Sequence, residues 1–263
     1  MAKPLDEVPE QFYKYRPMNE SKMVQRVENI VMRNQVYFAA PASFNDPFDL
    51  KPAFSLAAVP ERQRAEYMRL SRKFQPLLTE EQHTAEADTV MASSLSPENV
   101  ESTSRLIQDM HAMALSSVGV FCVSTKRDDI LMWSHYADSH CGVCLEFDGM
   151  FPFMAHAQQV TYSAICAPIN PYEDDTMAMM ERALLAKSEH WKYEAEWRLI
   201  SYQRGVGNVA YRPENLTGVI LGAQARPETI ETVRRWKRER SAPLKIYRAR
   251  TSSTKFELEI HPG

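Results

Sequence analysis

Short segments in which apolar and polar residues alternate recur along the chain, and this period of two predicts β-strands. A first strand is expected over residues 11–16 and a second over 35–40, because Pro17 and Pro41 follow them directly. Between them, Ser21 is expected to cap a helix whose apolar residues recur at helical spacing. The pattern thus predicts strand, helix and strand in this part of the chain.

Residues 60–117 show a different pattern. This stretch has few β-branched runs and many Met, Leu, Ala, Arg and Glu residues, which favours helices. We expect a helical insertion of two or three helices, with breaks near Pro76 and between Ser93 and Pro97. The insertion contains no recognisable motif.

Strand patterns return after this insertion. Strands are expected over residues 118–125, 142–148, 160–163, 218–222, 244–249 and 256–260. Helices are expected over residues 130–137 and 176–190, and a basic helix over 227–240. Because strands run from near the start to the end with helices between them, the sequence predicts one α+β domain over 1–263. Its core would be a single mixed, mostly antiparallel sheet, with the helical insertion 60–117 added to it.

Composition excludes some classes of protein. The 263 residues are 44% hydrophobic and 25% charged, which is typical of a soluble globular chain. The net charge of −3 gives no global basic field for nucleic acid. No apolar run approaches the roughly 18 residues of a membrane-spanning helix. The first residues lack the apolar core of a signal peptide, so we expect a cytoplasmic protein without a membrane partner.

The cysteines raise the question of a metal site. Cys141 and Cys144 have metal-ligand spacing and His140 precedes them, but no second pair of this kind exists. A zinc site needs about four converging ligands. Buried reduced thiols are therefore favoured, and no metal is expected.

The segment Lys192–Ile200 is the strongest candidate for chemistry. Read as a strand, it places Glu194, Glu196 and Arg198 on one face, and on the other face Tyr193, Ala195, Trp197 and Leu199. Adjacent carboxylates repel each other unless a cation or a bound substrate lies between them. Read as a helix, Glu194 and Arg198 would form an ordinary surface ion pair. The segment alone favours neither interpretation.

Further candidates lie at the ends of other predicted strands. Tyr15 and Arg16 end the first strand, where the guanidinium could clamp a phosphate and a tyrosine could stack on a ring. The alternative for Arg16 is a structural ion pair with Asp46 or Asp49. The favoured interpretation of Arg16 by itself is structural.

Two more pairs of residues have an ordinary structural alternative. Ser124 and Thr125 end a strand and could present two hydroxyls to a cleft, although such residues are common at strand ends. His135 and Tyr136 belong to an aromatic cluster, where a lone histidine is more often structural than a base. The order of all these elements is more informative than any one of them.

That order resembles the ADP-ribosyltransferases of the arginine–serine–glutamate class. The matching elements are Tyr15-Arg16, Phe121-Cys122-Val123-Ser124-Thr125 and Glu194-Ala195-Glu196-Trp197-Arg198-Leu199. The resemblance implies an ADP-ribosyltransferase-like fold with NAD as substrate. It implies that Glu196 grips the nicotinamide ribose and Glu194 prepares the acceptor. The residues expected to bind NAD are Tyr15, Arg16, Ser124, Thr125, His135 and Tyr136.

The resemblance to this class also implies that Arg16 contacts the dinucleotide and that Ser124 supports the catalytic glutamate. The chain departs from the class pattern at Lys126, which occupies the third position of the Ser-Thr-Ser motif. It also departs in the Met-Trp-x-His-Tyr segment that follows. Both departures concern the expected nicotinamide pocket.

A second resemblance covers almost the whole chain. It rests on residues 12–16, 44–49, 132–138, 142–147 and 191–198, which together look like a widespread bacterial family labelled domain of unknown function 2971. That label implies little about activity. The transferase hypothesis is therefore an inference added to the family resemblance.

Three functional hypotheses follow. The first is an NAD-dependent ADP-ribosyltransferase-like enzyme that modifies a protein or nucleic-acid acceptor, or hydrolyses NAD; a role as a toxin or in phage defence goes with it. The second is a non-enzymatic regulatory or interaction module with a buried polar network of Trp133, His135, Tyr136, Glu194 and Arg198. The third is a metal-dependent hydrolase or nuclease that uses Asp46, His135 and Glu196.

The predicted elements make two structural predictions. Trp191 and Trp197 should be largely buried, because Trp197 lies on the apolar face of the strand and Trp191 precedes it. One cleft should be lined by Arg16, Ser124, His135, Tyr136, Glu194 and Glu196.

Overall fold

The computed structural model describes residues 8–54, 60–94, 115–170 and 176–263, together with 105, 109, 112 and 113. Their contacts divide the chain into two compact units. The first unit comprises the chain up to Ala40, Val118–Tyr162 and Glu189–Gly263. The second comprises Pro41–Ser117 and Ser163–Ser188. A single domain over 1–263 stays a prediction.

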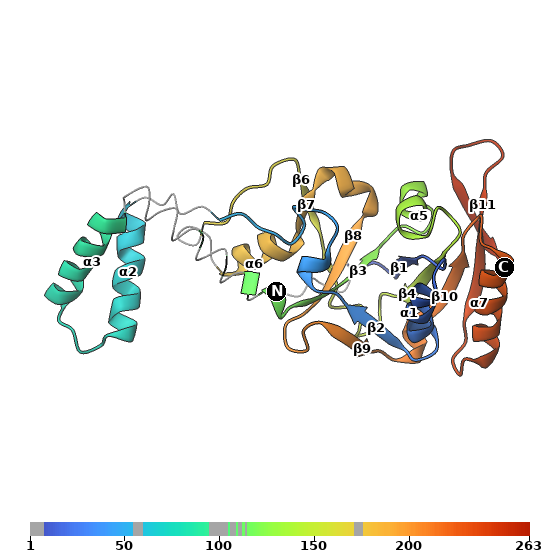
Figure 1. The fold of residues 1–263 in the computed structure, drawn as a ribbon, viewed down its shortest axis with the longest axis horizontal. Coiled ribbons are helices and arrows are strands. Elements are labelled where there is room, and N and C mark those ends of the chain that lie inside the picture. The colour runs from blue at the N-terminus through green and yellow to red at the C-terminus, as the bar shows by residue number, and fades with distance from the viewer. Residues whose placement is uncertain are drawn as a thin grey trace. The chain divides into compact units, whose positions relative to one another are not determined.

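The first unit is built on one large sheet (Figure 1). Its strands are β1 (Gln11–Arg16), β3 (Gly119–Ser124), β4 (Val143–Asp148), β5 (Gln158–Gln159), β8 (Glu196–Ser201), β10 (Leu216–Leu221), β11 (Lys245–Thr251) and β12 (Leu258–Pro262). These eight strands lie in the order β12-β11-β10-β4-β1-β3-β8-β5. Only β10 and β11 run parallel; the other neighbours are antiparallel. The predicted α+β class with a mostly antiparallel sheet is confirmed.

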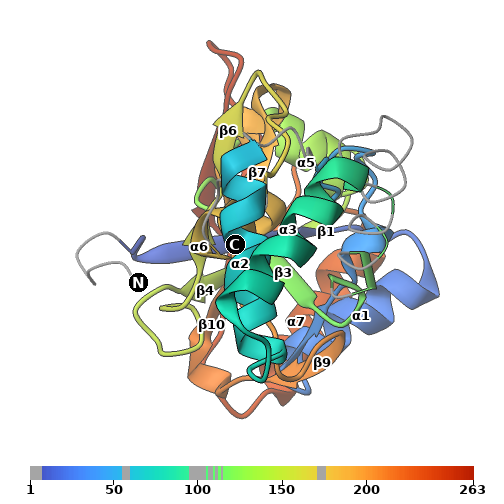
Figure 2. The ribbon, with the colours of Figure 1, turned by 90° about the vertical axis from the view of Figure 1, so that its left-hand side faces the viewer.

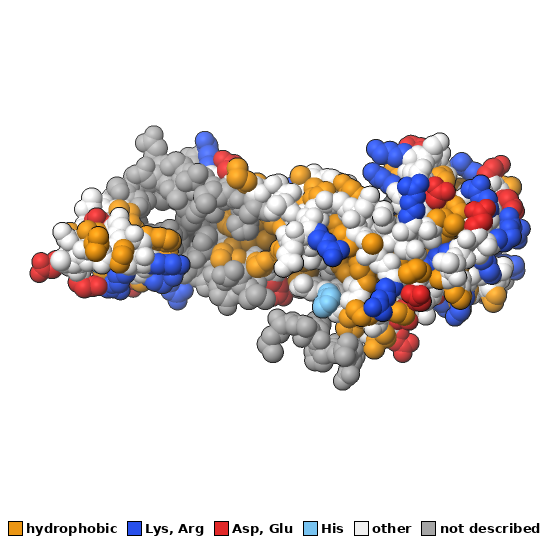
Figure 3. Space-filling model, turned by 90° about the horizontal axis from the view of Figure 1, so that it is seen from below, with side chains coloured by type: hydrophobic (Ala, Val, Ile, Leu, Met, Phe, Trp, Pro, Cys, Tyr) orange, Lys and Arg blue, Asp and Glu red, His pale blue; other side chains and the backbone are white. Residues whose placement is uncertain are grey.

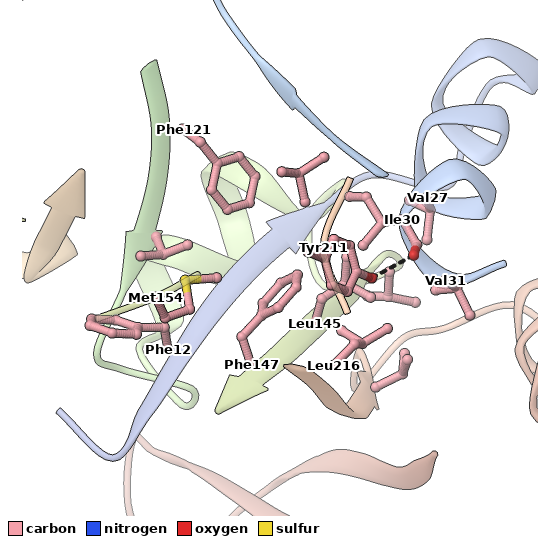
Figure 4. Close-up of a cluster of buried hydrophobic side chains, with 14 of the residues drawn as sticks. Phe12, Val27, Ile30, Val31, Phe121, Leu145, Phe147, Met154, Tyr211 and Leu216 are labelled. Carbon is pink, nitrogen blue, oxygen red and sulfur yellow. Dashed lines mark hydrogen bonds between the residues drawn. The ribbon is translucent and has the colours of Figure 1, made fainter. Parts of the chain in front are cut away.

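Alternation along the strands gives the sheet two apolar faces. One face carries Phe12, Phe121 and Phe147 and packs against α1 (Ser21–Val31) and α7 (Pro227–Glu239). Figure 4 shows the α1 side of this core, where the Tyr211 hydroxyl donates a hydrogen bond to the Ile30 carbonyl at 2.6 Å. The main hydrophobic core therefore lies between the sheet and these two helices.

The opposite face carries a smaller apolar cluster. Tyr13 and Tyr15, which alternate with Phe12 along β1, pack there against Met132 and Trp133 of the short helix α5 (Ile130–Tyr136). The Asp129 side chain caps this helix by accepting the N–H groups of Leu131 and Met132. This second face brings α5 next to the polar side chains of β1, β3 and β8.

The remaining elements of the first unit are short. β2 (Gln35–Phe38) pairs antiparallel with β9 (Gly207–Ala210). β6 (Thr161–Ser163) begins in this unit and ends at Ser163 of the second, and short 3-10 helices form η3 (Glu189–Glu194) and η4 (Pro213–Asn215). None of the helices in the described part of the chain combines the length and the apolar character needed to cross a membrane.

The second unit is largely helical. It contains η2 (Pro41–Ser43), α2 (Pro60–Phe74), α3 (Glu80–Ser94), α6 (Thr176–Leu185) and β7 (Ala186–Ser188). Helices α2 and α3 pack side by side (Figure 2), and a buried contact of 2.7 Å joins Ser71 Oγ to His83 Nδ1. Helices therefore occupy the start of the predicted insertion, and the expected break near Pro76 lies between them. The expected break between Ser93 and Pro97 falls mostly outside the described residues.

The largest difference from expectation lies between residues 176 and 200. The helix predicted over 176–190 ends at Leu185. The segment Lys192–Ile200, for which strand and helix were both left open, divides between η3 and β8. Between them, Ala195 has a φ of 43°, a left-handed conformation that no regular strand contains. Trp197 is buried as predicted, at 5% exposure. Trp191 lies in η3 and is less buried than Trp197.

Truncation of Trp197 to Ala is predicted to cost about 3–5 kcal/mol of folding free energy, because the ring fills the main core. Its ring centroid lies 5.5 Å from that of Phe12 on β1. The half-buried Trp191→Ala variant is the matched control and should lose much less. Urea unfolding of both variants measures the difference, and equal losses would show that the strand register is wrong.

Candidate functional site

The register of three neighbouring strands aligns the predicted site residues. Ser124 on β3 lies opposite Tyr13 of β1 on one side and opposite Glu196 of β8 on the other. Cys122 lies opposite Arg198 in the next row of the same face. Directly paired residues share a face of the sheet, so these side chains form one polar patch beside α5.

Glu196 and Arg198 form a buried ion pair at the centre of this patch. Arg198 Nε donates to Glu196 Oε1 at 2.8 Å, and a terminal nitrogen donates to Oε2 at 3.2 Å. Glu196 is 4% exposed and Arg198 is completely buried. The backbone N–H of Glu196 also donates to the Tyr162 hydroxyl at 2.8 Å. The two-pronged contact with Arg198 fixes both the position and the plane of the Glu196 carboxylate.

Glu194 ends the 3-10 turn and is also buried. Its Oε1 accepts the Tyr136 hydroxyl at 2.5 Å, and its backbone carbonyl accepts the Ser124 hydroxyl at 2.6 Å. Burial, and then the adjacent Glu194 carboxylate, raise the pKa of Tyr136 well above its usual range. Tyr136 therefore keeps its proton and remains a donor to Glu194. The Ser124 hydroxyl therefore binds the backbone of the Glu-x-Glu segment. This hydrogen bond does not involve a glutamate carboxylate.

Ala195 is the turning point between the two glutamates. Its left-handed φ of 43° is uncommon for a residue with a Cβ and costs on the order of 1–3 kcal/mol. The Ala195 carbonyl accepts the Thr125 N–H at 3.3 Å, which anchors the turn to the end of β3. Because the turn interrupts the strand, Glu194 reaches the patch from the 3-10 turn and Glu196 from the strand.

Two cations of β1, Lys14 and Arg16, alternate with Tyr13 and Tyr15 and so start from the other face of the sheet, which carries Phe12. Lys14 Nζ donates to the Cys122 carbonyl at 2.5 Å. Burial and then nearby Arg16 lower the pKa of Lys14 to about 8, while Cys122, Glu196 and Glu194 partly oppose the shift. Sequence reasoning missed Lys14, although a lysine inside a strand and flanked by two tyrosines was a usable signal.

Arg16 ends β1 with an incompletely satisfied guanidinium. Burial, and then repulsion by Arg26, lower the pKa of Arg16 to about 10. Its Nε is buried without a hydrogen-bond partner, and it forms no ion pair with any described residue of the first unit. The predicted alternative, a pair with Asp46 or Asp49 of the second unit, stays a prediction. Gly142 permits the close packing here, because a Cβ would lie 2.3 Å from the Arg16 carbonyl oxygen.

The other predicted residues lie around this cluster. His135 is exposed, and its Nδ1 lies 2.9 Å from the hydroxyl of Tyr193, the neighbour of Glu194. Tyr15 donates to the Lys126 carbonyl at 2.8 Å and packs edge-on against Trp133. The structure thus connects Ser124 and Tyr136 to Glu194 by hydrogen bonds, and Glu196 to Arg198 and Tyr162. An open cleft lined by all the predicted residues stays a prediction, because Ser124, Glu194 and Glu196 are nearly completely buried.

The cysteines are free thiols. Cys144 is buried as expected, whereas Cys122 and Cys141 are half-buried and Cys166 is exposed. Burial raises the pKa of the Cys122 thiol above its usual range, and the adjacent Glu196 raises it further. Within the described ranges, no three His, Cys, Asp or Glu side chains group in a way that could hold a metal ion.

Residues 132–199 match a family model described as a protein of unknown function (DUF2971). The chain resembles this family. The matched range runs from α5 through the Glu-x-Glu segment to β8, and it leaves out Arg16 and Ser124. No curated protein and no solved structure matches the chain. The family resemblance expected from the sequence is confirmed, and it assigns no activity.

The Tyr136→Phe substitution is predicted to destabilise the protein by about 1.5–3 kcal/mol, because it removes a hydrogen bond to a buried carboxylate. Tyr15→Phe removes a hydrogen bond to a neutral carbonyl and should cost only about 0.5–1.5 kcal/mol. Chemical unfolding of the two variants compares them directly. Equal losses would contradict a charged Glu194.

Lys14 is predicted to make stability depend on pH. Its folded pKa of about 8 lies below the value of about 10.4 for an unfolded lysine. Between these values the unfolded chain binds more protons, so the free energy of unfolding rises with pH. The destabilisation caused by burying the protonated Lys14 ammonium is fully present below about pH 8 and decreases as the pH rises towards about 10.4.

The measurement is the free energy of unfolding of wild type minus that of Lys14→Met, followed across this pH window. The difference should rise with pH, whatever its sign at neutral pH. A difference that stays constant would show that Lys14 titrates normally.

Proposed function

We propose that this protein is an NAD-dependent ADP-ribosyltransferase-like enzyme, which transfers ADP-ribose to a protein or nucleic-acid acceptor or to water in the cytoplasm. The observation that carries the proposal is the strand register. It places Ser124 directly opposite Glu196, with the Arg16 strand β1 next to β3. These are the three elements whose order in the sequence resembles the transferase class.

The proposed reaction breaks the bond between nicotinamide and ribose. Positive charge develops on the ribose carbon as nicotinamide leaves, and a fixed carboxylate next to the ribose hydroxyl stabilises it. Glu196 suits this role because Arg198 holds it in one orientation.

The surrounding side chains suit the other parts of NAD. Positive charge for the phosphates is assigned to Lys14, whose Nζ reaches the Cys122 carbonyl of β3, and to Arg16 at the end of β1, whose Nε has no hydrogen-bond partner among the described residues. Tyr136 and Tyr162 each contact one half of the Glu-x-Glu segment, where their rings could enclose the nicotinamide. In this scheme Glu194 prepares the acceptor.

The proposed reaction requires NAD to reach the buried Glu196 carboxylate. Because Glu196 is 4% exposed, NAD binding has to open a path to its carboxylate. The strained residue Ala195 lies between the two glutamates and is the natural hinge for that change.

A second candidate is a non-enzymatic regulatory or interaction module. One observation favours it: Glu196 and Arg198 are buried and already satisfy each other. Buried polar networks of this kind can fix a unique fold without any chemistry. Breaking such a pair by removing one charge costs about 3–5 kcal/mol.

The Glu196→Gln variant separates the two candidates. If the protein is a transferase, nicotinamide release from NAD should fall on the order of 10²-fold or more, because the charge that stabilises the transition state is lost. Exposed Glu189 on the adjacent 3-10 turn provides the matched control, Glu189→Gln, which should keep full activity.

Nicotinamide release is measured with plausible protein and nucleic-acid acceptors present, together with melting curves of all three proteins. No release from well-folded wild type, together with a destabilised Glu196→Gln variant, would decide for the structural network.

A further inference from the structure

A second concave site lies at the other end of the large sheet. It is a hollow of about 370 Å³ between α7, β11 and the end of β12. Five basic residues line it: Arg234, Lys237, Arg238, Arg248 and Arg250. Strands β10, β4, β1 and β3 separate β11 from β8, so this hollow is independent of the Glu196 site.

The register explains why these cations converge. Leu221 on β10 pairs with Arg248, and Leu221 belongs to the main core that α7 covers. Arg248 and the alternate residue Arg250 therefore face the side of the sheet on which α7 lies. Arg234 and Arg238 lie four residues apart on α7 and share one face of the helix. The two elements thus present their positive charges to the same space.

The acidic groups nearby are too few to neutralise the hollow. Glu231 pairs with Arg238 at 3.1 Å. Glu259 lies opposite Arg250 in the register of β11 and β12, but it contacts His261 at 3.2 Å. Among the described residues, Arg234, Lys237, Arg248 and Arg250 have no ion-pair partner. Like charges that converge repel each other. An anion bound in the hollow would therefore reduce the repulsion between these basic side chains.

This positive region contrasts with the chain as a whole, whose net charge is −3. Figure 3 shows Lys and Arg side chains, with some Asp and Glu among them, at the end of the molecule that carries α7 and β11 in Figure 1. A local field of this sign concentrates anions even on an acidic protein.

The shape of the hollow and its lining define the class of ligand. Its volume is that of a small-molecule pocket. Its floor is aliphatic, from Ile230 and Ile246, and no aromatic side chain lines it. Single-stranded nucleic acids are held by aromatic platforms along an extended groove, which this hollow lacks. Several guanidinium groups in a compact space instead match closely spaced phosphates.

We propose that this hollow binds a small ligand that carries two or more adjacent phosphate groups. Arg234 and Lys237 contribute from α7, and Arg248 and Arg250 contribute from β11. The ligand is either an inorganic polyphosphate or the phosphate chain of a nucleotide, which share this chemistry.

Isothermal titration calorimetry with inorganic tripolyphosphate tests the proposal, at an ionic strength of about 0.1 M, where the Debye length is about 10 Å. Saturable binding with one site per chain is expected, and it should weaken as salt is added. ATP is titrated in parallel: tighter binding than tripolyphosphate points to a nucleotide, and equal binding points to the phosphate chain alone. A single-stranded oligonucleotide is the third probe.

The Arg234→Ala and Arg248→Ala variants should each bind about tenfold more weakly, since each loses a charge-assisted contact. Arg235→Ala is the matched control, because Arg235 is an exposed arginine of the same helix outside the lining. Arg234 is exposed, so its variant should melt like wild type and report on binding alone even if Arg248→Ala folds poorly.

Three results would overturn the proposal. They are the absence of saturable binding to tripolyphosphate and ATP, an equal loss in Arg235→Ala, and tighter binding of the oligonucleotide than of either phosphate compound.

Discussion

Glu196 and Arg198 lie two residues apart on one face of β8, and both side chains are withdrawn from water. Two charges in a protein interior are tolerated only when they pair closely and their remaining hydrogen bonds are satisfied. On the other face of the same strand, Trp197 fills the main core. β8 is thus fixed from both sides, and a shift of one residue would place the charges in the core and the tryptophan in the polar patch.

The rest of the site is arranged around this fixed strand. Ser124 lies opposite Glu196 and holds the preceding backbone through the Glu194 carbonyl. Tyr136 reaches Glu194 from α5, which packs on the same face of the sheet through Trp133. Glu194, Glu196 and Arg198 thus place both signs of charge close together at low solvent exposure. Such an arrangement strengthens every electrostatic interaction within it, whether its role is catalytic or structural.

Much of the fold was predictable from the sequence because local patterns determine it. The strand Gln11–Arg16 has the expected bounds and the helix Ser21–Val31 lies where it was expected, since alternation and helical periodicity are properties of the segments themselves. The predicted cap at Ser21 was wrong, because the N-cap residue is Glu20. The break at Ala195 was not predictable, because alanine carries no signal for a left-handed conformation. Tertiary contacts, including the hydrogen bonds of Ser124 and Thr125, impose it.

The candidate site was predictable only in part. Its residues were recognised from their order, but their burial was not, since exposure depends on how α5 and η3 cover the sheet. The basic helix was expected over 227–240, yet its convergence with Arg248 and Arg250 depends on the parallel pairing of β10 and β11. Contacts between distant segments cannot be derived from the periodicity of either one.

The most direct test of the central claim is a crystal structure of the protein soaked with NAD. The account predicts density for the dinucleotide with a phosphate at Arg16, the nicotinamide ribose at Glu196 and the Glu196–Arg198 contact preserved. Density elsewhere, or a site that stays closed with no ligand at saturating NAD, would contradict an NAD-dependent enzyme and leave the polar cluster as a structural device.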